Sequence, residues 1–181
     1  IQVSQQLQTN KKASTPNLFR FGMVMDLPYE MEKSVYYGRG PIENYPDRKL
    51  SQRIGRYEQM ADDQFYPYIR PQETGTKGDM RWWKQTDRQG IGLKVVADAP
   101  FYASATHYTI PDVDDGDRKE QRHSYQLKRS CFTELYLDGA HAGVGGIDSW
   151  SGWAEALEPY QVKCEDRAFT FWLLPTETVG D

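Results

Sequence analysis

Two carboxylates in the segment PIENYPDR, Glu43 and Asp47, are the first residues whose types suggest catalytic chemistry. Cleavage of a glycosidic bond, for example, needs two carboxyl groups that face each other at roughly 5 to 9.5 Å. Pro41 and Pro46 lie in the same segment, so no helix can place both carboxylates on one face. We favour a structural interpretation, in which Asp47 and Arg48 pair with neighbouring groups and fix an irregular loop, because buried polar groups in loops need partners.

A second charged segment, PQETGTKGDMRWW, contains Glu73, Asp79 and Arg81. Its glycines, prolines and polar residues indicate a loop followed by more apolar chain. We expect these charges to satisfy one another and the loop backbone, rather than to act on a substrate.

The remaining polar motifs show no metal or nucleotide pattern. His107, His123 and His141 have no ligand spacing and are interpreted as structural histidines. The segment PDVDDGDRKE resembles a calcium loop in composition only, because Gly116 occupies an acidic position and no glutamate closes the loop, so a solvated insertion is favoured. The glycines of GVGG are not followed by the lysine and hydroxyl residue of a phosphate-binding loop.

Trp150 stands in an unusual context, the segment GVGGIDSWSG. A tryptophan that fills a core normally has large apolar neighbours, and here most neighbours are small or polar. One interpretation is a ring held at the edge of a cleft, where the C–H face of a sugar stacks on it. The alternative is a ring buried under a neighbouring strand, and the local sequence leaves both open.

The charge balance argues against nucleic acid or an anionic membrane surface as a partner. The net charge is -4 over 181 residues, both signs are spread along the chain, and the densest charge cluster, DVDDGDRKE, is acidic. No apolar run is long enough to span a bilayer, and no leader pattern opens the chain. The chain begins at Ile1 without an initiator methionine, so we expect one domain that is a piece of a longer protein.

The two cysteines, Cys131 and Cys164, lie far apart in the sequence and do not form a metal-type spacing. We expect two buried free thiols rather than a disulfide. This cysteine usage fits a reducing or an oxidising compartment, so the cytoplasm and the periplasm of a bacterium both stay open.

The composition favours β-structure, with 5 Trp, 12 Tyr and 7 Phe beside 15 Gly and 10 Pro. Apolar residues alternate with polar ones in residues 19–27, which predicts a strand with one buried face. Further strands are predicted at 34–37 and 167–174. Residues 91–97 and 101–110 are predicted to form consecutive strands, as a hairpin joined at 98–100.

Two further local predictions concern a turn and a helix. Asp138 and Gly139 separate two short apolar runs, and this dipeptide is a strong signal for a two-residue hairpin. Residues 117–127 are the only candidate helix. Residues 8–17 and 176–181 are expected to form loops or frayed ends.

Three long segments together resemble one known family. They are YYGRGPIENYPDRK (residues 36–49), YIRPQETGTKGDMRWW (residues 68–83) and GVGGIDSWSG (residues 143–152). In this order and spacing they look like the C-terminal domain, or small chain, of the glycoside hydrolase family 2 β-galactosidases, and the resemblance runs from about residue 19 to residue 175. The sequence departs from the family pattern at Ile147, where the family often has an acidic residue, and at 111–119, which looks like an insertion.

The resemblance implies an all-β fold with very little helix: a large antiparallel supersandwich, similar to galactose mutarotase. It implies that residues 1–181 are a C-terminal sandwich domain, with earlier strands of the domain preceding Ile1. It further implies a parent enzyme that hydrolyses terminal β-D-galactose residues of lactose-like substrates. The catalytic glutamates and the magnesium and sodium ligands would then lie in upstream domains, and this chain would hold no catalytic residue, metal or cofactor of its own.

The resemblance also assigns roles to individual residues. Trp150 would line the subsite for the leaving sugar at the mouth of the active site. The loop that positions it would comprise Gly145, Gly146, Asp148 and Ser149. Scaffold and interface roles are implied for Glu43, Asn44, Tyr45, Asp47, Arg48, Glu73 and Arg81.

Two functions from different classes follow. In the first, the chain is the substrate-subsite domain of a retaining β-galactosidase, and its partners are the upstream TIM-barrel and sandwich domains of the same polypeptide, a galactoside, and further copies of the parent in a homo-oligomer. In the second, the chain is a non-catalytic carbohydrate-binding module that uses Trp150 as its platform, with Trp153 as a second candidate. The residues that precede Ile1 distinguish the two.

Overall fold

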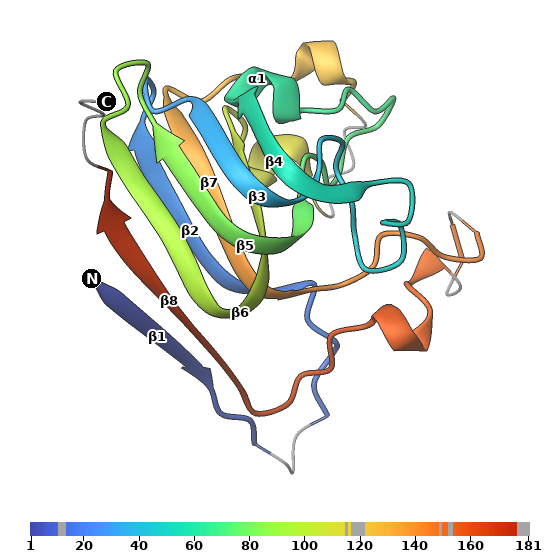
Figure 1. The fold of residues 1–181 in the computed structure, drawn as a ribbon. Helices are drawn as coiled ribbons and strands as arrows, with labels where there is room; N and C mark the ends of the chain where they lie inside the picture. Colours follow the sequence, from blue (N-terminus) through green and yellow to red (C-terminus); the bar gives the residue numbers. More distant parts are fainter. Residues whose placement is uncertain (11–13, 115, 117–121, 149, 152–153, 177–181) are drawn as a thin grey trace.

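The computed structural model spans residues 1–181 and describes 1–10, 14–114, 116, 122–148, 150–151 and 154–176. The described residues are built mainly from one large antiparallel sheet of eight strands (Figure 1). The strands are β1 (Gln2–Leu7), β2 (Arg20–Pro28), β3 (Lys33–Gly40), β4 (Arg53–Met60), β5 (Lys77–Thr86), β6 (Gly92–Thr106), β7 (Phe132–His141) and β8 (Arg167–Pro175). The all-β class predicted from the sequence is confirmed.

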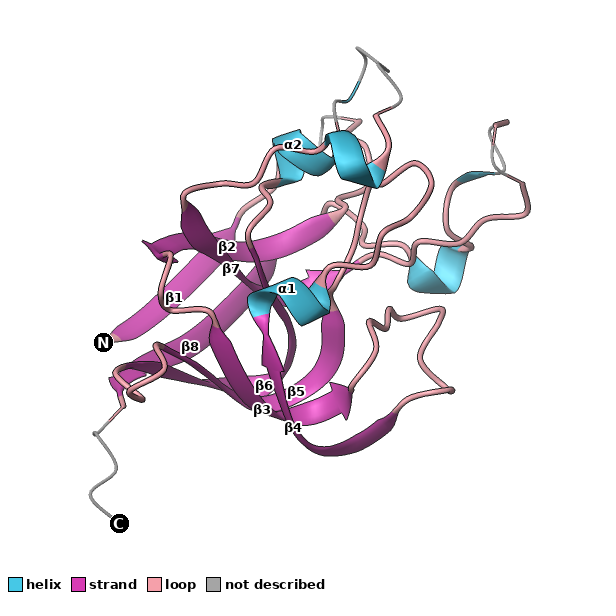
Figure 2. Cartoon of the chain, turned by 90° about the horizontal axis from the view of Figure 1, so that it is seen from above, coloured by secondary structure: helices cyan, strands magenta, loops and turns pink. Residues whose placement is uncertain are grey.

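The helical segments are short and lie outside the sheet, as Figure 2 shows. They are α1 (Ala61–Gln64), α2 (Ile110–Val113) and the 3₁₀ turns Ser124–Gln126 and Glu158–Tyr160. Of the helix predicted at 117–127, residues 117–121 lie outside the described residues. The described remainder forms only the 3₁₀ turn, so no α-helix forms there.

The sheet forks at β6, which is the longest strand. One edge of β6 pairs with β5 along most of its length, whereas the other edge pairs first with β8, through Leu93 to Ala97, and then with β7, through Tyr102 to Thr106. Residues 98–100 have no ladder partner and mark the bend between the two halves. The predicted hairpin of 91–97 and 101–110 is therefore wrong: 92–97 and 101–106 are halves of one strand, and Pro100, which has no N–H to donate, lies at the unpaired bend.

The branches β8–β1 and β7–β2 close on each other to form a sandwich. The ring of Phe169 in β8 lies over Gly139 in β7, only 2.7 Å from where a Cβ would be. The predicted turn at Asp138 and Gly139 is also wrong, because both lie inside β7, where the pairing with β2 skips Gly139 as a β-bulge. The glycine permits the close approach of the Phe169 ring rather than a chain reversal.

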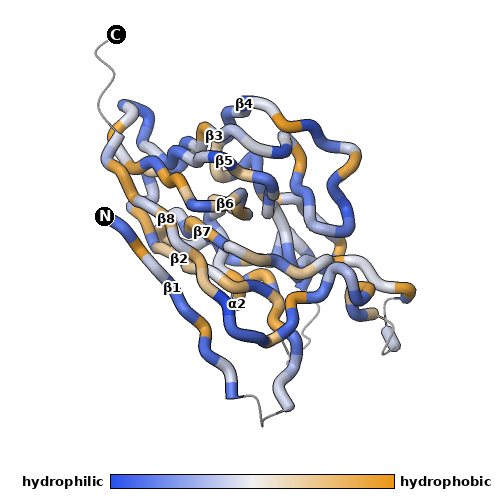
Figure 3. Tube along the Cα trace, turned by 60° about the horizontal axis from the view of Figure 1, so that its bottom comes forward, coloured by the Kyte–Doolittle hydropathy of each residue, from blue (hydrophilic) through white to orange (hydrophobic). Residues whose placement is uncertain are grey.

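The core fills the space between these branches and the β3–β5 part of the sheet. Hydrophobic and hydrophilic residues are interspersed along the strands, as the colours of the trace in Figure 3 show. Successive residues of a strand point to opposite faces, so one set of each strand can pack against the core. In β2 the predicted alternation is confirmed, with Met23, Met25 and Leu27 packed against the core and Val24 half-exposed. The most deeply buried large side chains of the core are Tyr36, Met80, Trp83, Val95, Phe101, Leu135, Leu137 and Phe171.

The strands predicted at 34–37 and 167–174 are confirmed as parts of β3 and β8, while β1, β4 and β5 were not predicted. Both cysteines are free, as expected, but the expectation that both are buried is wrong: Cys131 is exposed and Cys164 is partly exposed, because each lies in a bend outside the strands. None of the helices in the described residues is long and apolar enough to cross a membrane.

Candidate functional site

An open groove of about 840 Å³ lies where the three sequence motifs meet. Tyr45 and Arg48 come from the loop after β3, Tyr68 and Glu73 come from the loop before β5, and Gly143 follows β7. Residues 15–19 and 154–156 also line the groove. The segments that flank the Trp150 loop on both sides, 142–144 and 154–156, are therefore parts of the groove wall.

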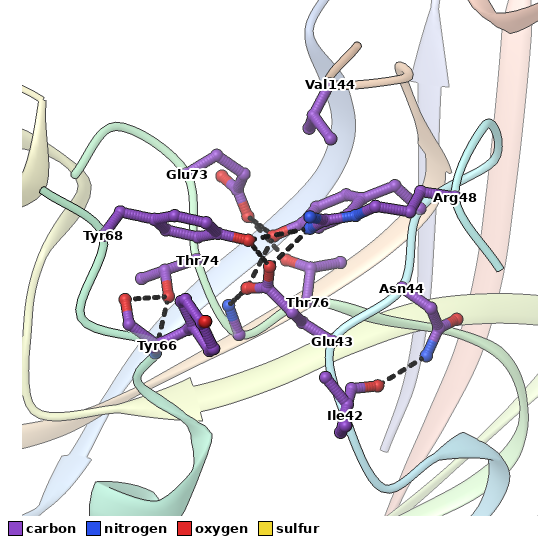
Figure 4. A network of polar contacts seen from close by, with 12 residues as sticks. Ile42, Glu43, Asn44, Arg48, Tyr66, Tyr68, Glu73, Thr74, Thr76 and Val144 are labelled. Atoms are coloured by element: carbon purple, nitrogen blue, oxygen red, sulfur yellow. Dashed lines mark hydrogen bonds and ion pairs between the residues drawn. The ribbon is translucent and has the colours of Figure 1, made fainter. Parts of the chain in front are cut away.

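Glu43 is the buried centre of a polar network at one side of this groove (Figure 4). Its carboxylate accepts hydrogen bonds from Arg48, from the hydroxyl of Tyr68, and from the backbone amide of Gly75 at 2.7 Å. The same Arg48 lies over the ring of Tyr45, with Cζ 5.3 Å from the ring centroid. Both carboxylate oxygens of Glu43 are thus engaged in holding the two loops together.

Glu73 belongs to a second charged cluster and itself lines the groove. It accepts from the hydroxyl of Thr76 at 2.7 Å, and it faces Arg20 at 3.7 Å and Nε2 of His141 at 3.8 Å. Nδ1 of His141 donates to the carbonyl oxygen of Ala142, so Nε2 is the nitrogen that faces Glu73. Burial raises the pKa of Glu73, but His141, Arg20 and Thr76 outweigh burial and hold this pKa below its ordinary value. Glu73 is therefore an ionised structural carboxylate.

Asp47 lies in a tight turn of sequence YPDR. The backbone amide of Tyr45 donates to Arg48 at 3.2 Å, and the amide of Arg48 donates back to Tyr45 at 2.9 Å. Pro46 occupies the second position of this turn, where its fixed φ is favourable. The Asp47 carboxylate binds the glycine-rich segment after β7, whereas the Glu43 carboxylate binds Arg48, Tyr68 and Gly75, so each carboxylate is engaged in holding loop segments.

The chain after β7 is held through four successive backbone amides. Ala142 donates to the carbonyl of Phe19 and Gly143 to the carbonyl of Tyr160, both at 2.8 Å. The next two amides donate to Asp47, Val144 to Oδ1 at 3.2 Å and Gly145 to Oδ2 at 2.8 Å. The start of the glycine-rich loop therefore has a defined course.

Asp148 organises the end of the same loop. Its carboxylate accepts from the backbone amides of Trp150, at 3.0 Å, and Ser151, at 2.8 Å, and from the Ser151 hydroxyl. The hydroxyl of Ser151 and these two amides hold the pKa of Asp148 below its ordinary value. Of the other predicted loop residues, Gly146 is exposed, and Ser149, like Trp153, lies outside the described residues.

The side chain of Trp150 projects into solvent and is 87% exposed. Ile147, at the position where the sequence departs from the family pattern, is 67% exposed. The alternative in which the ring is buried under a neighbouring strand is therefore wrong for this structure. An indole in this position is free to stack on a ligand that arrives from outside.

The other predicted scaffold residues satisfy local backbone groups and charges. The amide nitrogen of Asn44 donates to the carbonyls of Arg39 and Ile42, and its Oδ1 accepts from Gly78. Arg81 donates to the carbonyl of Asp79, whose carboxylate binds Arg39 at 2.7 Å. Glu73 does not join these charges, because its charged partners, Arg20 and His141, come from β2 and β7.

The histidines have separate surroundings. His107 is buried between Asp62, with Nδ1 to Oδ1 at 3.0 Å, and Thr133, with Nε2 to Oγ1 at 3.1 Å. His123 is exposed and contacts the carbonyl of Ile69. Within the described ranges, no group of three or more His, Cys, Asp or Glu residues is placed to hold a metal ion.

Sequence reasoning missed two residues that shape this region. Arg20 binds Asp138 at 2.9 Å and faces Glu73, and so joins β2, β7 and the loop before β5. Tyr68 donates to Glu43 and receives a hydrogen bond from Arg48. The one available signal was an arginine at the start of an otherwise apolar strand, where a charge must find a buried partner.

Comparison with known proteins gives one consistent family. The family model described as β-galactosidase small chain matches residues 1–173. The chain is 38% identical to a β-galactosidase of Vibrio cholerae over 75% of the chain and 12% of that protein. It is 34% identical to β-galactosidase BgaC of Bifidobacterium adolescentis over 86% of the chain and 14% of that protein, and 30% identical to a β-galactosidase of Halalkalibacterium halodurans over 94% and 16%.

The chain spans less than a fifth of the length of these relatives, so most of each relative lies outside the matched region. The family model nevertheless covers nearly the whole chain, including all three motifs whose residues line the groove. The chain therefore belongs to the β-galactosidase small chain family.

Proposed function

We propose that this chain is the C-terminal domain of a longer, retaining β-galactosidase that removes terminal β-D-galactose from lactose-like substrates. In this proposal the chain forms one wall of the active-site mouth, and the catalytic glutamates belong to preceding parts of the parent protein. Support comes from relatives that are named β-galactosidases and that extend far beyond this chain. The preceding TIM-barrel and sandwich domains are the proposed partners, together with further copies of the parent protein in a homo-oligomer.

The observation that carries the role of this domain is the exposed indole of Trp150 on a tethered loop. The ring is 87% exposed, while the backbone before it is held by Asp47 and the backbone around it by Asp148. A sugar offers a face of C–H groups to such a ring, and the area removed from water is worth roughly 1 to 2 kcal/mol. We assign Trp150 to the subsite of the leaving sugar.

The metals of the family do not fit the part of this chain that the structure describes. Glu43 and Glu73 beside the groove are bound by arginines, hydroxyls and a backbone amide, and the described residues place no group of three or more His, Cys, Asp or Glu side chains to hold a metal ion. Magnesium and sodium ligands are therefore assigned to the preceding domains of the parent. The contribution of this chain is to bind and orient the departing sugar.

Substituting Trp150→Ala in the full-length enzyme tests this role. For lactose, the KM is expected to rise about fivefold to thirtyfold, which corresponds to the loss of roughly 1 to 2 kcal/mol of stacking. Transfer of galactose to glucose as acceptor should fall as well, because the acceptor uses the same subsite. The kcat for an aryl galactoside with a good leaving group should change little, since the bond to galactose is broken by groups elsewhere.

Tyr125→Ala is the matched control, because Tyr125 is an aromatic side chain of similar exposure, 83%, on the separate 3₁₀ turn at Ser124–Gln126. This variant should leave both the KM for lactose and the transfer reaction unchanged. A folded Trp150→Ala enzyme with unchanged KM and unchanged transfer would remove Trp150 from the proposed subsite.

A further inference from the structure

We infer that Asp47 is a positioning residue for Trp150: its carboxylate fixes the start of the Trp150 loop and so sets where the indole meets the leaving sugar. This inference rests on the proposed function of Trp150. The Asp47 carboxylate joins two motifs that lie far apart in the sequence. One is the turn after β3 and the other is the glycine-rich segment after β7.

The support under Asp47 is rigid. Tyr45 and Arg48 close the turn with two backbone hydrogen bonds, and the ring of Tyr45 is 1% exposed. Arg48 is in turn bound to buried Glu43. The carboxylate of Asp47 on such a turn has few positions available, so the backbone amides that it binds are also held in one place.

The contact between Asp47 and the loop is specific. The two oxygens of one carboxylate receive the two successive amides of Val144 and Gly145, at 3.2 and 2.8 Å. Hydrogen bonds to an ionised acceptor are stronger than those between neutral groups. Because the amides belong to adjacent residues, the pair fixes both the position and the direction of the chain as it runs toward Trp150.

The glycines are complementary to this carboxylate. A Cβ on Gly143 would lie 2.6 Å from Cγ of Asp47, and a Cβ on Gly145 would lie 3.1 Å from its Oδ2. The backbone approaches Asp47 this closely only because both positions lack a side chain. Asp47 and the glycines at 143 and 145 therefore fit each other: the carboxylate binds the backbone, and the absence of side chains at the two glycines lets the backbone come close enough to be bound.

We expect the contact with Asp47 to preorganise the Trp150 loop before a sugar binds. Trp150 has few contacts that hold its ring, so the course of the loop backbone decides where the ring stands. Without Asp47, part of the stacking energy would be spent on ordering the loop when the sugar binds. The loss should appear in the handling of the leaving or acceptor sugar, and cleavage of an activated galactoside should be affected less.

The experiment uses the full-length enzyme with Asp47→Ala and Asp47→Asn. Asp47→Ala should raise the KM for lactose about threefold to tenfold and lower the transfer to glucose, as expected for a loss smaller than that of the ring itself. Asp47→Asn keeps one acceptor oxygen and should show a smaller change in the same direction. Asp98→Ala, an exposed carboxylate at the bend of β6, is the matched control and should match the wild type.

A double-mutant cycle separates this inference from the proposed function. If Asp47 acts through the ring, Asp47→Ala should add little to the KM for lactose in an enzyme that already carries Trp150→Ala. An equally large increase in that background would show that Asp47 acts independently and would overturn the inference. If Trp150→Ala alone changes nothing, the proposed function fails instead.

Thermal unfolding of each variant shows whether the variant is folded. If Asp47→Ala does not fold, Asp47→Asn and Gly145→Ala carry the test, because Gly145→Ala brings a methyl group against Oδ2 of Asp47 from the other side of the same contact. Unchanged KM and unchanged transfer in these folded variants, beside a clear effect of Trp150→Ala, would also overturn the positioning role.

Discussion

Lys77 carries its ammonium group into the interior of the sheet and is 1% exposed. Nζ donates to Oε1 of Gln64 at 3.1 Å and to the carbonyl of Gly75 at 2.8 Å. Burial lowers the pKa of Lys77 to about 7, although the charge of Glu43 acts in the opposite direction. A lysine of this kind makes the stability of the fold depend on pH.

The sign of this dependence follows from the two pKa values of Lys77. The folded chain releases the Lys77 proton near pH 7, whereas an unfolded lysine keeps it up to about pH 10.5. Between these values the unfolded chain binds more protons, so the free energy of unfolding contributed by Lys77 rises with pH. Lys77→Met should abolish this rise, as measured by urea denaturation at pH 7, 8 and 9.

Lys84→Met is a suitable control for that measurement, because Lys84 lies on the same strand, β5, but is only partly buried. This variant should keep the rise of the free energy of unfolding with pH. Equal slopes for the wild type and Lys77→Met would show that the ammonium group does not titrate as its surroundings imply.

At the residue scale, the exposure of Trp150 does not follow from the local sequence alone, which left a buried ring open as well; the structure decides between the two. The partners of Glu73 do not follow either, since Arg20 and His141 come from strands that precede and follow it by many residues. Pairs of this kind depend on the register of the whole sheet. A single sequence shows that a buried charge needs a partner, but it does not show which one.

At the element scale, the bulge between β2 and β7 places two backbones unusually close together. A Cβ added to Gly22 would lie 2.1 Å from the carbonyl oxygen of Leu137 and 2.5 Å from Cα of Asp138. Both neighbouring atoms are backbone, so the strands would have to move apart. This contact is where the β7–β2 branch is least tolerant of added volume.

Gly22→Ala should therefore destabilise the chain by about 1 to 3 kcal/mol, the usual cost of overpacking. Val24→Thr on the same strand is the control, because Val24 is half-exposed and both residues are β-branched. Chemical denaturation of both variants measures the difference. A free energy of unfolding for Gly22→Ala equal to that of the control would mean that the strands separate there without cost.

The two wrong predictions of chain reversals have one physical origin. An Asp-Gly pair and a segment with a proline both interrupt a strand pattern, but an interruption is satisfied by a bulge or by a bend as well as by a turn. In β7 the glycine makes room for the ring of Phe169, and in β6 the proline lies where the strand changes partners. Only the tertiary arrangement decides among these outcomes. The long alternation in residues 19–27, by contrast, was sufficient to identify β2.

At the scale of the whole molecule, two carboxylates beside the groove, Glu43 and Glu73, share one hydroxyl group as a neighbour. Both contact the hydroxyl of Tyr45, at 3.4 and 3.3 Å, so they lie near each other. A retaining glycosidase needs one such group as a nucleophile and the other as a proton donor. Glu43 is already bound by Arg48 and the amide of Gly75, and the pKa of Glu73 is lowered, so Glu73 cannot hold a proton at neutral pH.

The isolated chain is therefore expected to hydrolyse no nitrophenyl galactoside above the buffer blank. It should bind galactose or lactose only in the millimolar range or more weakly, because one stacking face cannot offset the cost of immobilising a sugar without groups on the other side. Release of nitrophenol and isothermal calorimetry measure these outcomes. Hydrolysis that disappears in Glu43→Gln or Glu73→Gln would place a catalytic pair in this chain. Micromolar binding that disappears in Trp150→Ala would favour a self-sufficient carbohydrate-binding module, since the platform would then work without the rest of the enzyme.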